Sequence, residues 1–386
     1  NISTNVYLQN NRRLLKMTTY EKLLEPITLP NGVTIPHRTA MAPMVVMGAN
    51  DDGTISDLDV AYFDKRADVA GLIITGAAYV NKMAYGFDGQ ISIAKDEDIP
   101  GLKKLAETAK KAGNKVVIQL HHAGREALYD KLGKVVAPSA VEFPFLDYVP
   151  EEMSADEIEE TIKDFGRATK RAIQAGFDGV EVHGANHYLL QQFFSAYSNR
   201  RTDQWGGTLE KRMAFPLAVL KEVQRVVKES GKQDFIVGYR ISPEEIHGEN
   251  VGYHIDEALQ LVEKVVSEQV DYIHVSVFTG YAVGPEGSDK SYGELVKEVV
   301  NNRCPVIIVS NVFTADDALE ALNHGDIVAI GRAALIEPEF TKKIREDRAD
   351  EIETSVENRL DQLAIPPKAI EWFKMEGSLL PPLPGI

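Results

Sequence analysis

Residues 179–195 read GVEVHGANHYLLQQFFS, and this stretch joins a buried strand to the start of an apolar helix. The valine-rich run before His183 is typical of a strand, and the leucines and phenylalanines after Tyr188 are typical of a helix. Between them the chain places a histidine, an amide and a phenol where small turn-forming residues would suffice. A strand that leads directly into a helix is the repeating unit of an α/β fold.

Seven other short apolar runs have the same strand character. They end near Met44, Gly76, Gln119, Arg240, Ser276, Ser310 and Gly331. Helical patterns separate the runs, at residues 58–68, 101–112, 155–175, 209–229, 255–268, 292–301 and 315–323. Buried strands that alternate with helices pair in parallel through right-handed crossovers. Eight repeats therefore predict an α/β fold of the (β/α)8 TIM-barrel type in a single domain.

A doubly wound sheet is the competing fold. It would carry a glycine-rich G-x-G-x-x-G turn after an early strand, whereas the first strand here leads into APMVVMGAND. The barrel is therefore expected over residues 17–350. One connection, residues 122–153, is much longer than the others and is expected to form a lid over the barrel mouth.

The two ends of the chain differ from the barrel in composition. Residues 1–16 are polar and patternless, so we interpret them as a leader or expression-derived segment, expected to be disordered, with Met17 as the natural start. Residues 351–386 end in an apolar, proline-rich tail. This tail is predicted to pack on the barrel or on a neighbouring subunit, with Trp372 and Phe373 covering the barrel's own surface.

Composition and charge exclude several classes of protein. The chain has 386 residues, of which 44% are hydrophobic and 26% charged, as in soluble globular proteins. A formal net charge of −16 argues against binding to nucleic acid or to an anionic membrane. No apolar run approaches the roughly 20 residues that cross a bilayer, so a cytoplasmic location is expected. Cys304 is the only cysteine, which excludes disulfides, cysteine-ligated zinc and iron–sulfur clusters within this chain.

The residues at the strand ends limit which reactions the protein could catalyse, because barrel enzymes carry their reacting groups there. No lysine ends a strand, which argues against Schiff-base chemistry, and carboxylates are too few for a metal hydrolase. The rim is neutral and hydrogen-bonding, with Arg240 as its charge, and suits a flat polar heterocycle. Gly331 and Arg332 after the last strand suit a phosphate group, although the pair could equally serve the turn alone.

Six motifs occur along the chain in a recognisable order: MAPM (41–44), IQLHHAGR (118–125), APSA (137–140), EVHGANHYLL (181–190), SNRRTDQWGG (198–207) and IGR (330–332). With these motifs the chain resembles the Old Yellow Enzyme family, the FMN-dependent ene-reductases, from about residue 23 to residue 340. The resemblance is to the short form of the family. Larger relatives append an iron–sulfur cluster and a second nucleotide-binding domain.

The resemblance implies that FMN is the cofactor and that NADPH or NADH is the reductant. It assigns the flavin to Ala42, Pro43, Met44, Val45, Ala77, Gln119, Arg240, Asn311, Val312, Gly331 and Arg332. Gln119 would donate and accept at the pyrimidine edge, and Arg240 would stabilise negative charge near N1 of the reduced ring. Val45 stands where relatives commonly carry a threonine or cysteine, so we expect a flavin that is harder to reduce. Asn311 and Val312 replace a usual glycine.

The resemblance also assigns catalysis and substrate binding to His183, Asn186 and Tyr188. The first two would donate N–H groups to a carbonyl oxygen, and Tyr188 would protonate the α-carbon. The implied reaction is a ping-pong reduction of activated C=C bonds in α,β-unsaturated carbonyl compounds, with quinones or nitro compounds as further acceptors. His187 stands where relatives usually carry glycine, and no role is predicted for it.

Two other functions remain open from the sequence. An FMN-dependent hydroxy-acid oxidase or dehydrogenase usually needs a general-base histidine near the seventh or eighth strand, whereas His324 precedes the eighth. A flavin-binding sensor without turnover would not need the catalytic triplet. The expected partners are a small-molecule substrate and a nicotinamide cofactor, no metal is expected, and assembly into a homo-oligomer is left open.

Overall fold

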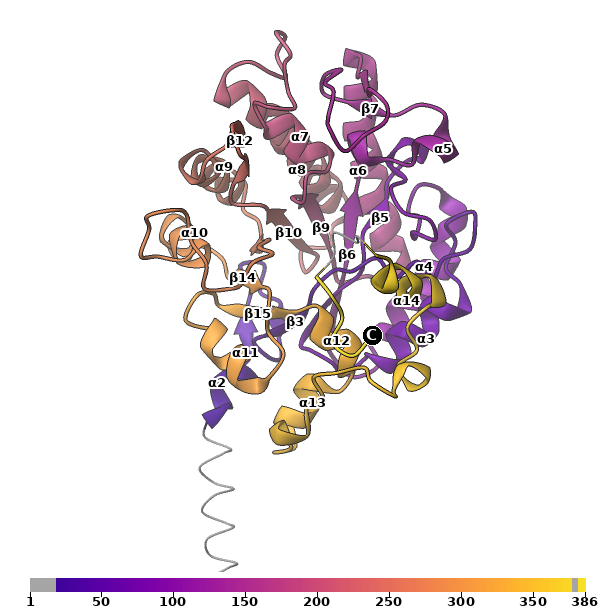
Figure 1. Cartoon of the computed structure of the whole chain (residues 1–386), viewed down its shortest axis with the longest axis vertical. Coiled ribbons are helices and arrows are strands. Elements are labelled where there is room, and N and C mark those ends of the chain that lie inside the picture. The colour runs from indigo at the N-terminus through magenta and orange to yellow at the C-terminus, as the bar shows by residue number, and fades with distance from the viewer. Residues whose placement is uncertain (1–18, 377–380) are drawn as a thin grey trace, which may run out of the picture.

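The structure is a computed structural model that describes residues 19–376 and 381–386 (Figure 1). The predicted segment 1–16 lies outside these residues. Within them, a ring of eight parallel strands forms the centre of the molecule, and helices surround it. This architecture confirms the predicted (β/α)8 barrel in a single domain.

The strands of the ring occur where the apolar runs predicted them, each ending within three residues of the predicted end. They are β3 (Thr39–Met41), β4 (Leu72–Ile74), β6 (Lys115–His121), β9 (Gly179–Gly184), β10 (Ile236–Ile241), β13 (Tyr272–Val275), β14 (Val306–Val309) and β15 (Ile327–Ile330). Each strand pairs in parallel with the next, and the β15–β3 pairing closes the ring. No edge of the described ring is left open.

The seven predicted helices form outside the ring. They are α3 (Asp57–Lys65), α4 (Ile99–Ala109), α6 (Ala155–Ala175), α8 (Leu209–Ser230), α9 (Ile255–Ser267), α10 (Tyr292–Val300) and α11 (Ala315–Ala321), and α12 (Arg332–Ile336) and α13 (Phe340–Arg345) follow β15. Local chemistry sets their ends. The hydroxyl of Ser154 accepts a 3.2 Å hydrogen bond from the Glu157 amide at the start of α6, and Gly176 ends that helix with a left-handed φ of 85°.

Smaller strands and helices lie at the two ends of the barrel. The strands are β1 (Ile27–Thr28), β2 (Thr34–Ile35), β5 (Ala78–Tyr79), β7 (Val136–Ala137), β8 (Glu151–Glu152), β11 (Glu245–His247) and β12 (Asn250–Tyr253). The α-helices are α2 (Glu21–Leu24), α5 (Tyr129–Leu132), α7 (Leu189–Phe194) and α14 (Pro367–Lys374). Short 3-10 turns are η1 (Lys82–Ala84), η2 (Asp96–Asp98), η3 (Gly124–Glu126), η4 (Ala349–Glu351) and η5 (Leu360–Gln362).

The barrel interior changes character along its axis. Alternate strand residues point inward. At the amino end they are apolar, and the β1–β2 hairpin adds Leu29 and Ile35 to the same buried cluster. Toward the carboxyl end the inward positions become polar, with Gln119, Glu181, Arg240 and His274 all buried. Because apolar packing fills only the amino end, a polar site is left at the carboxyl end. None of the helices in residues 19–376 and 381–386 has the length and apolar character to span a membrane.

Candidate active site

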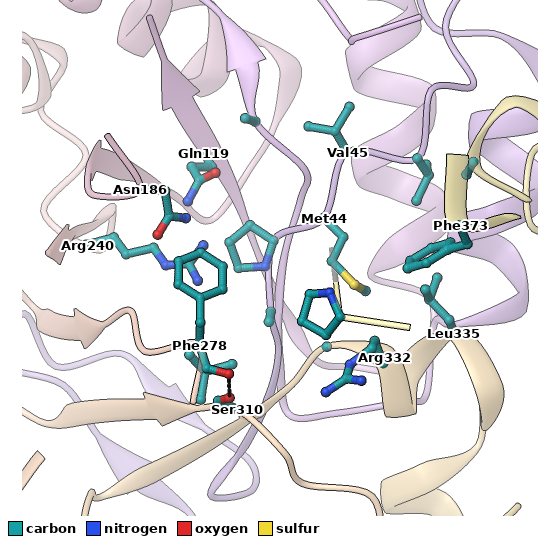
Figure 2. A pocket seen from close by; sticks show the side chains of 18 of the residues that line it. Met44, Val45, Gln119, Asn186, Arg240, Phe278, Ser310, Arg332, Leu335 and Phe373 are labelled. Atoms are coloured by element: carbon teal, nitrogen blue, oxygen red, sulfur yellow. Dashed lines mark hydrogen bonds between the residues drawn. The ribbon is translucent and has the colours of Figure 1, made fainter. Parts of the chain in front are cut away.

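A cavity of about 630 Å³ opens at the carboxyl ends of the barrel strands. Every residue that the sequence assigned to FMN or to catalysis lines it: Ala42, Pro43, Met44, Val45, Ala77, Gln119, His183, Asn186, Tyr188, Arg240, Asn311, Val312, Gly331 and Arg332. Gln119, Asn186 and Arg240 lie on one side of the cavity, with Arg332 and Phe373 on the other (Figure 2). The fold therefore brings all these residues to one cavity, while their binding roles remain predictions.

Strand register explains why the polar residues meet. Gln119 on β6 pairs with Glu181 on β9, and Arg240 on β10 pairs with both His183 and His274. Residues that pair across parallel strands point to the same face of the sheet. The five side chains therefore form one inward-facing layer below the mouth of the barrel.

A buried hydrogen-bond network runs through this layer. Gln119 Nε2 donates to Glu181 Oε1 over 2.7 Å, and His274 Nδ1 lies 2.9 Å from Glu181 Oε2. Burial opposes ionisation of Glu181, but His274 and Arg240 outweigh it and hold the pKa of this carboxyl below its usual value. Gln119 thus keeps its amide oxygen and one amide hydrogen for a ligand. The sequence analysis did not predict that Glu181 would hold Gln119. Its inward-facing position on the strand, opposite Gln119, could have indicated this contact.

Arg240 is the buried cation of the cavity. Its Nε has no hydrogen-bond partner among the described residues. A buried N–H group that is left without a partner costs free energy, so a ligand that accepts from it binds favourably. The arginine faces the cavity beside Gln119, and together they match the electron-rich edge of a flavin ring (Figure 2).

His183 and Asn186 present two N–H donors to the cavity. The Ala185 amide donates to His183 Nδ1 over 3.2 Å, and burial lowers the pKa of His183 well below its ordinary value. The neutral ring therefore carries its hydrogen on Nε2. The Ser276 hydroxyl donates to Asn186 Oδ1 over 2.6 Å, which leaves the Asn186 amide hydrogens free.

Tyr188 completes the group at the start of α7. Its ring centroid lies 4.4 Å from that of His121 and 5.1 Å from that of His183, with both contacts edge-on. Burial raises the pKa of the Tyr188 phenol well above its ordinary value. The side chain therefore stays protonated at neutral pH and can act as a proton donor.

Glu126 is a cavity residue that the sequence did not predict. It follows the IQLHHAGR motif in η3, and its carboxylate lies 3.9 Å from Arg125 Nε. Burial raises the pKa of Glu126 to about 7, although Arg125 opposes the shift. The cavity therefore gains a group that changes charge near neutral pH. Of the long connection that was expected to form a lid, Glu126 is the described residue that lines the cavity.

The wall opposite the catalytic turn comes from the end of the chain. Trp372 and Phe373 on α14 line the cavity, and the Trp372 ring lies 5.8 Å from that of Phe87. The sequence interpretation has these two aromatic residues cover the barrel's own surface, and in the structure they lie over the cavity at the mouth of that barrel. A helix with two bulky apolar residues buries more of them over an open cavity than on the charged outer surface.

Gly331 and Arg332 shape the far end of the cavity. A Cβ atom added at Gly331 would meet nothing closer than Met44 Sδ at 3.8 Å, so the protein's own packing does not require a glycine there. The free space lets a ligand approach the backbone closely. Arg332 donates to Pro382 O and to Asn311 Oδ1, both over 2.8 Å. Its charge is thus held at the site, but part of its donor capacity is used within the protein.

Known proteins share both the sequence and the fold. The profile of the NADH:flavin oxidoreductase / NADH oxidase family matches residues 22–351. The probable NADH-dependent flavin oxidoreductase YqiG of Bacillus subtilis is 43% identical over 342 residues, which cover 87% of this chain and 91% of that protein. An NADH:fumarate oxidoreductase of Klebsiella pneumoniae is 40% identical over 340 residues, which cover 85% of this chain and 36% of that protein.

A solved structure extends the comparison. Morphinone reductase in complex with tetrahydroNAD is 30% identical, with a TM-score of 0.73 over 85% of this chain and 91% of that one. The Arg240 Nε, which has no hydrogen-bond partner among the described residues, the free amide groups of Gln119 and the open space at Gly331 fit the flavin of this family. The chain therefore belongs to the NADH:flavin oxidoreductase / NADH oxidase family and is an FMN-dependent oxidoreductase that draws electrons from a nicotinamide cofactor.

Proposed function

We propose that the protein reduces activated C=C bonds of α,β-unsaturated carbonyl compounds. The observation that carries this proposal is the pair of N–H donors from His183 and Asn186, which face the cavity beside the protonated phenol of Tyr188. Bound FMN supplies the hydride chemistry, and the protein supplies orientation and electrostatics.

The donors act on the carbonyl group of the substrate. As the β-carbon is reduced, negative charge moves to the carbonyl oxygen, and two preorganised N–H groups stabilise it. The α-carbon becomes basic at the same time, and the Tyr188 hydroxyl delivers the proton there. A neutral His183 suits this role better than a charged imidazolium, since the buried cavity already holds the Arg240 cation.

The flavin is proposed to lie along the length of the cavity. Gln119 and Arg240 would hold the pyrimidine edge, with Arg240 facing the negative charge of the reduced ring. Asn311, Val312, Gly331 and Arg332 would hold the phosphate end, and Ala42, Pro43, Met44, Val45 and Ala77 would face the ring system. The two ends lie on opposite sides of the cavity, as a long cofactor requires (Figure 2).

The names of relatives support the substrate class. One relative is an NADH:fumarate oxidoreductase and another is an NADH:acrylate oxidoreductase, each 40% identical to this chain. Fumarate and acrylate are both conjugated alkenes. The relatives include NADH- and NADPH-dependent proteins, and the more similar ones are named for NADH. We therefore propose NADH as the preferred reductant and the cytoplasm as the site of action.

The hydroxy-acid oxidase alternative lacks its general base. His324 Nδ1 lies 2.8 Å from Ser291 Oγ at the start of α10, and His324 is not among the residues that line the cavity. His183 does line it, but the Ala185 amide occupies its Nδ1, so its free nitrogen is a donor. A donor cannot remove the proton from a hydroxyl group.

Two half-reactions test the proposal on the purified flavoprotein. NADH and NADPH are mixed with the enzyme under anaerobic conditions, and loss of the oxidised flavin absorbance is followed. The reduced enzyme is then mixed with a cyclic enone, fumarate, a quinone or a nitroalkene. We expect stoichiometric reoxidation by the enone with formation of the saturated ketone. Reduction by nicotinamide with no reoxidation by any of these alkenes contradicts the proposed substrate class.

A further inference from the structure

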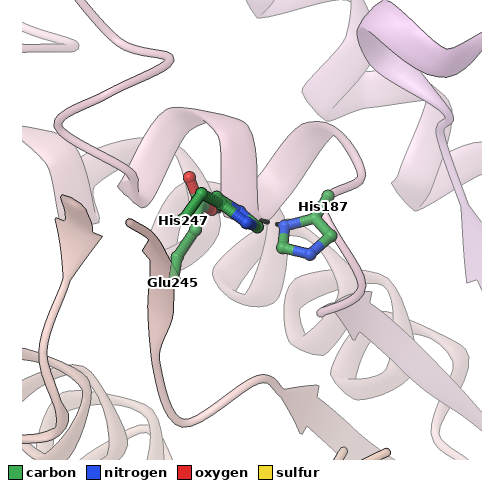
Figure 3. A group of neighbouring side chains, drawn as sticks. All are labelled: His187, Glu245 and His247. Atoms are coloured by element: carbon green, nitrogen blue, oxygen red, sulfur yellow. Dashed lines mark ion pairs between the residues drawn. The ribbon is translucent and has the colours of Figure 1, made fainter. Parts of the chain in front are cut away.

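A second group of polar side chains lies beside the catalytic turn, outside the cavity described above. It contains His187 from the turn and Glu245 and His247 from β11 (Figure 3). His187 Nδ1 lies 3.6 Å from Glu245 Oε2, and the rings of His187 and His247 lie 5.0 Å apart. One potential ligand atom from each of the three residues lies within 4.8 Å of the other two.

Two of the ligand atoms, His187 Nδ1 and Glu245 Oε2, face one position. The Gln191 amide nitrogen lies 2.7 Å from Glu245 Oε2 and 3.0 Å from His187 Nδ1. Gln191 Oε1 accepts from the His187 amide, so its NH2 group faces both acceptors. A neutral donor group therefore occupies the point where the lone pairs of a carboxylate and an imidazole converge. A cation at this point would replace the donor group.

Glu245 is prepared as a ligand by its surroundings. The carboxylate is buried, and the Ser195 hydroxyl holds its other oxygen over 2.6 Å. Metal-binding carboxylates are commonly oriented by such hydrogen bonds. Its ion-pair partner within the described residues is His187, and no lysine or arginine lies within ion-pair distance of it there. A buried carboxylate without a fixed cation favours one.

His187 and His247 also line a separate cavity of about 190 Å³. This cavity leaves one side of the group open to water or to a small ligand. Arg125 lines it too and is the charge that opposes a cation, but Glu126 lies 3.9 Å from Arg125 and offsets that charge.

We propose that His187, Glu245 and His247 form a binding site for a divalent transition-metal cation, with Zn²⁺ as the best match. Two imidazoles and one carboxylate are a ligand set that zinc accepts, at distances of about 2.0–2.2 Å. Ligand atoms around such an ion lie about 3.3–3.6 Å apart in a tetrahedral arrangement, close to the 3.6 Å between His187 Nδ1 and Glu245 Oε2. His247 is exposed at the end of β11, next to Gly248, and its ligand atom lies within 4.8 Å of those of His187 and Glu245.

The position of the site has a consequence for the enzyme. His187 lies between Asn186 and Tyr188, and β11 belongs to the hairpin that ends at Tyr253. A cation shared by His187 and the hairpin would tie this hairpin to the turn that carries the donor and the acid. Metal binding should therefore raise thermal stability, whether or not the proposed alkene reduction is correct.

Titration of the chelator-treated, desalted holoenzyme tests the site. Zn²⁺ binding is measured by calorimetry, and Co²⁺ binding by its visible absorbance. We expect one ion per chain and a rise in melting temperature. His247→Ala and His187→Gly should each weaken binding by at least about tenfold, as loss of a ligand does. Glycine is suited to position 187 because His187 has a φ of 66°.

Matched controls separate this site from incidental binding. The chain has nine histidines, and the exposed His254, which follows the same hairpin, serves as the control position. His254→Ala should bind Zn²⁺ like the unaltered protein. Flavin content and melting temperature without metal confirm that each variant is folded. The proposal is overturned if the unaltered protein takes up less than one ion per chain, or if His247→Ala binds as tightly as His254→Ala.

Discussion

At the scale of single residues, three polar side chains in the cavity each have one atom engaged within the protein and another left free. His183 accepts from the Ala185 amide, Asn186 accepts from Ser276, and Gln119 donates to Glu181. The engaged atom determines which group faces the cavity. Because the donors are already oriented, little reorganisation is needed when charge develops on a substrate, and this preorganisation is a large part of enzymatic rate enhancement.

Tyr188 allows the two half-reactions to be separated. Tyr188→Phe removes the hydroxyl but keeps the ring contacts with His121 and His183. We expect alkene reduction to slow by about 10²–10⁴-fold, the usual contribution of a general acid. Flavin reduction by NADH should change little, as measured by stopped-flow absorbance. An equal loss in both half-reactions contradicts the assigned role.

The identity of residue 45 leads to a prediction for the redox potential of the bound flavin. The side chain lines the cavity and has no hydrogen-bond donor. Val45→Thr adds a hydroxyl, and one hydrogen bond to the reduced flavin contributes about 0.5–1.5 kcal/mol. The two-electron midpoint potential should therefore rise by about 10–30 mV, measured by dye equilibration. Val45→Ile, which adds no donor, is the control. An unchanged potential in the threonine variant contradicts the prediction.

Glu126 predicts a pH dependence. Its pKa is raised to about 7, so the carboxyl is neutral below that pH and negative above it. A negative charge in the cavity repels an anionic substrate. For fumarate, kcat/KM should therefore fall as the pH rises from 6 to 8, while a neutral enone is affected less. Glu126→Gln should remove the difference between the two substrates, and a fumarate profile that keeps the same inflection in this variant would rule out Glu126 as its cause.

At the scale of elements, the cavity is built from segments that are far apart in the chain. The floor comes from the strand ends, while α14 supplies an aromatic wall from the other end of the sequence. Arg66, the residue directly after α3, links these parts. Its guanidinium donates to Leu335 O over 3.1 Å and to Leu363 O over 2.8 Å. These bonds position the segment that leads into α14.

Trp372 tests the importance of the α14 wall. Trp372→Ala exposes apolar surface of the cavity, and the loss of about 80 Å² of apolar contact corresponds to about 2 kcal/mol. We expect the dissociation constant for FMN to rise by about 30-fold, measured by fluorescence of the released flavin. Phe145→Ala is the control, since Phe145 is 63% exposed and does not line this cavity. Equal FMN affinity in the two variants contradicts a role for α14 in retention.

At the scale of the whole molecule, a closed ring of strands distributes local changes over the entire barrel. Each strand of the ring pairs with a neighbour on both sides, and residues from β6, β9, β10 and β15 or the turns after them reach the same cavity. A ligand that contacts several strand ends stabilises the ring as a unit. The described barrel should therefore unfold in one cooperative transition that depends on the cofactor.

Removal of FMN tests this coupling. A ligand that binds only the folded state stabilises it by about 2.7 kcal/mol when present at 100 times its dissociation constant. Flavin-free protein should therefore melt several degrees lower in scanning calorimetry, and added FMN should restore the melting temperature. Riboflavin, which lacks the phosphate, should restore less if Gly331 and Arg332 hold the phosphate end. Identical melting curves with and without FMN contradict the coupling.

Local patterns were sufficient for the elements and for most of the cavity. Helix α6 spans the predicted residues 155–175, because its apolar periodicity, the Ser154 cap and Gly176 are all encoded within a short window. The family resemblance could assign roles to His183, Asn186 and Tyr188 because they lie within six residues of one motif. The positions of Glu126 and Trp372 could not be predicted in the same way. The residues that surround each of them in the cavity lie far away in the sequence, so no local pattern indicates them.

The sequence by itself determined the barrel, the family and the identity of the polar residues at the strand ends, since strand alternation, helix caps and motifs are short-range properties. Tertiary structure alone decided which of these residues share a surface. Phe87 meets Trp372 and Glu181 meets His274 only when the ring closes and the tail folds back over it. The same closure brings His187 to Glu245 and His247. Such contacts depend on the register of distant strands, which no local pattern specifies.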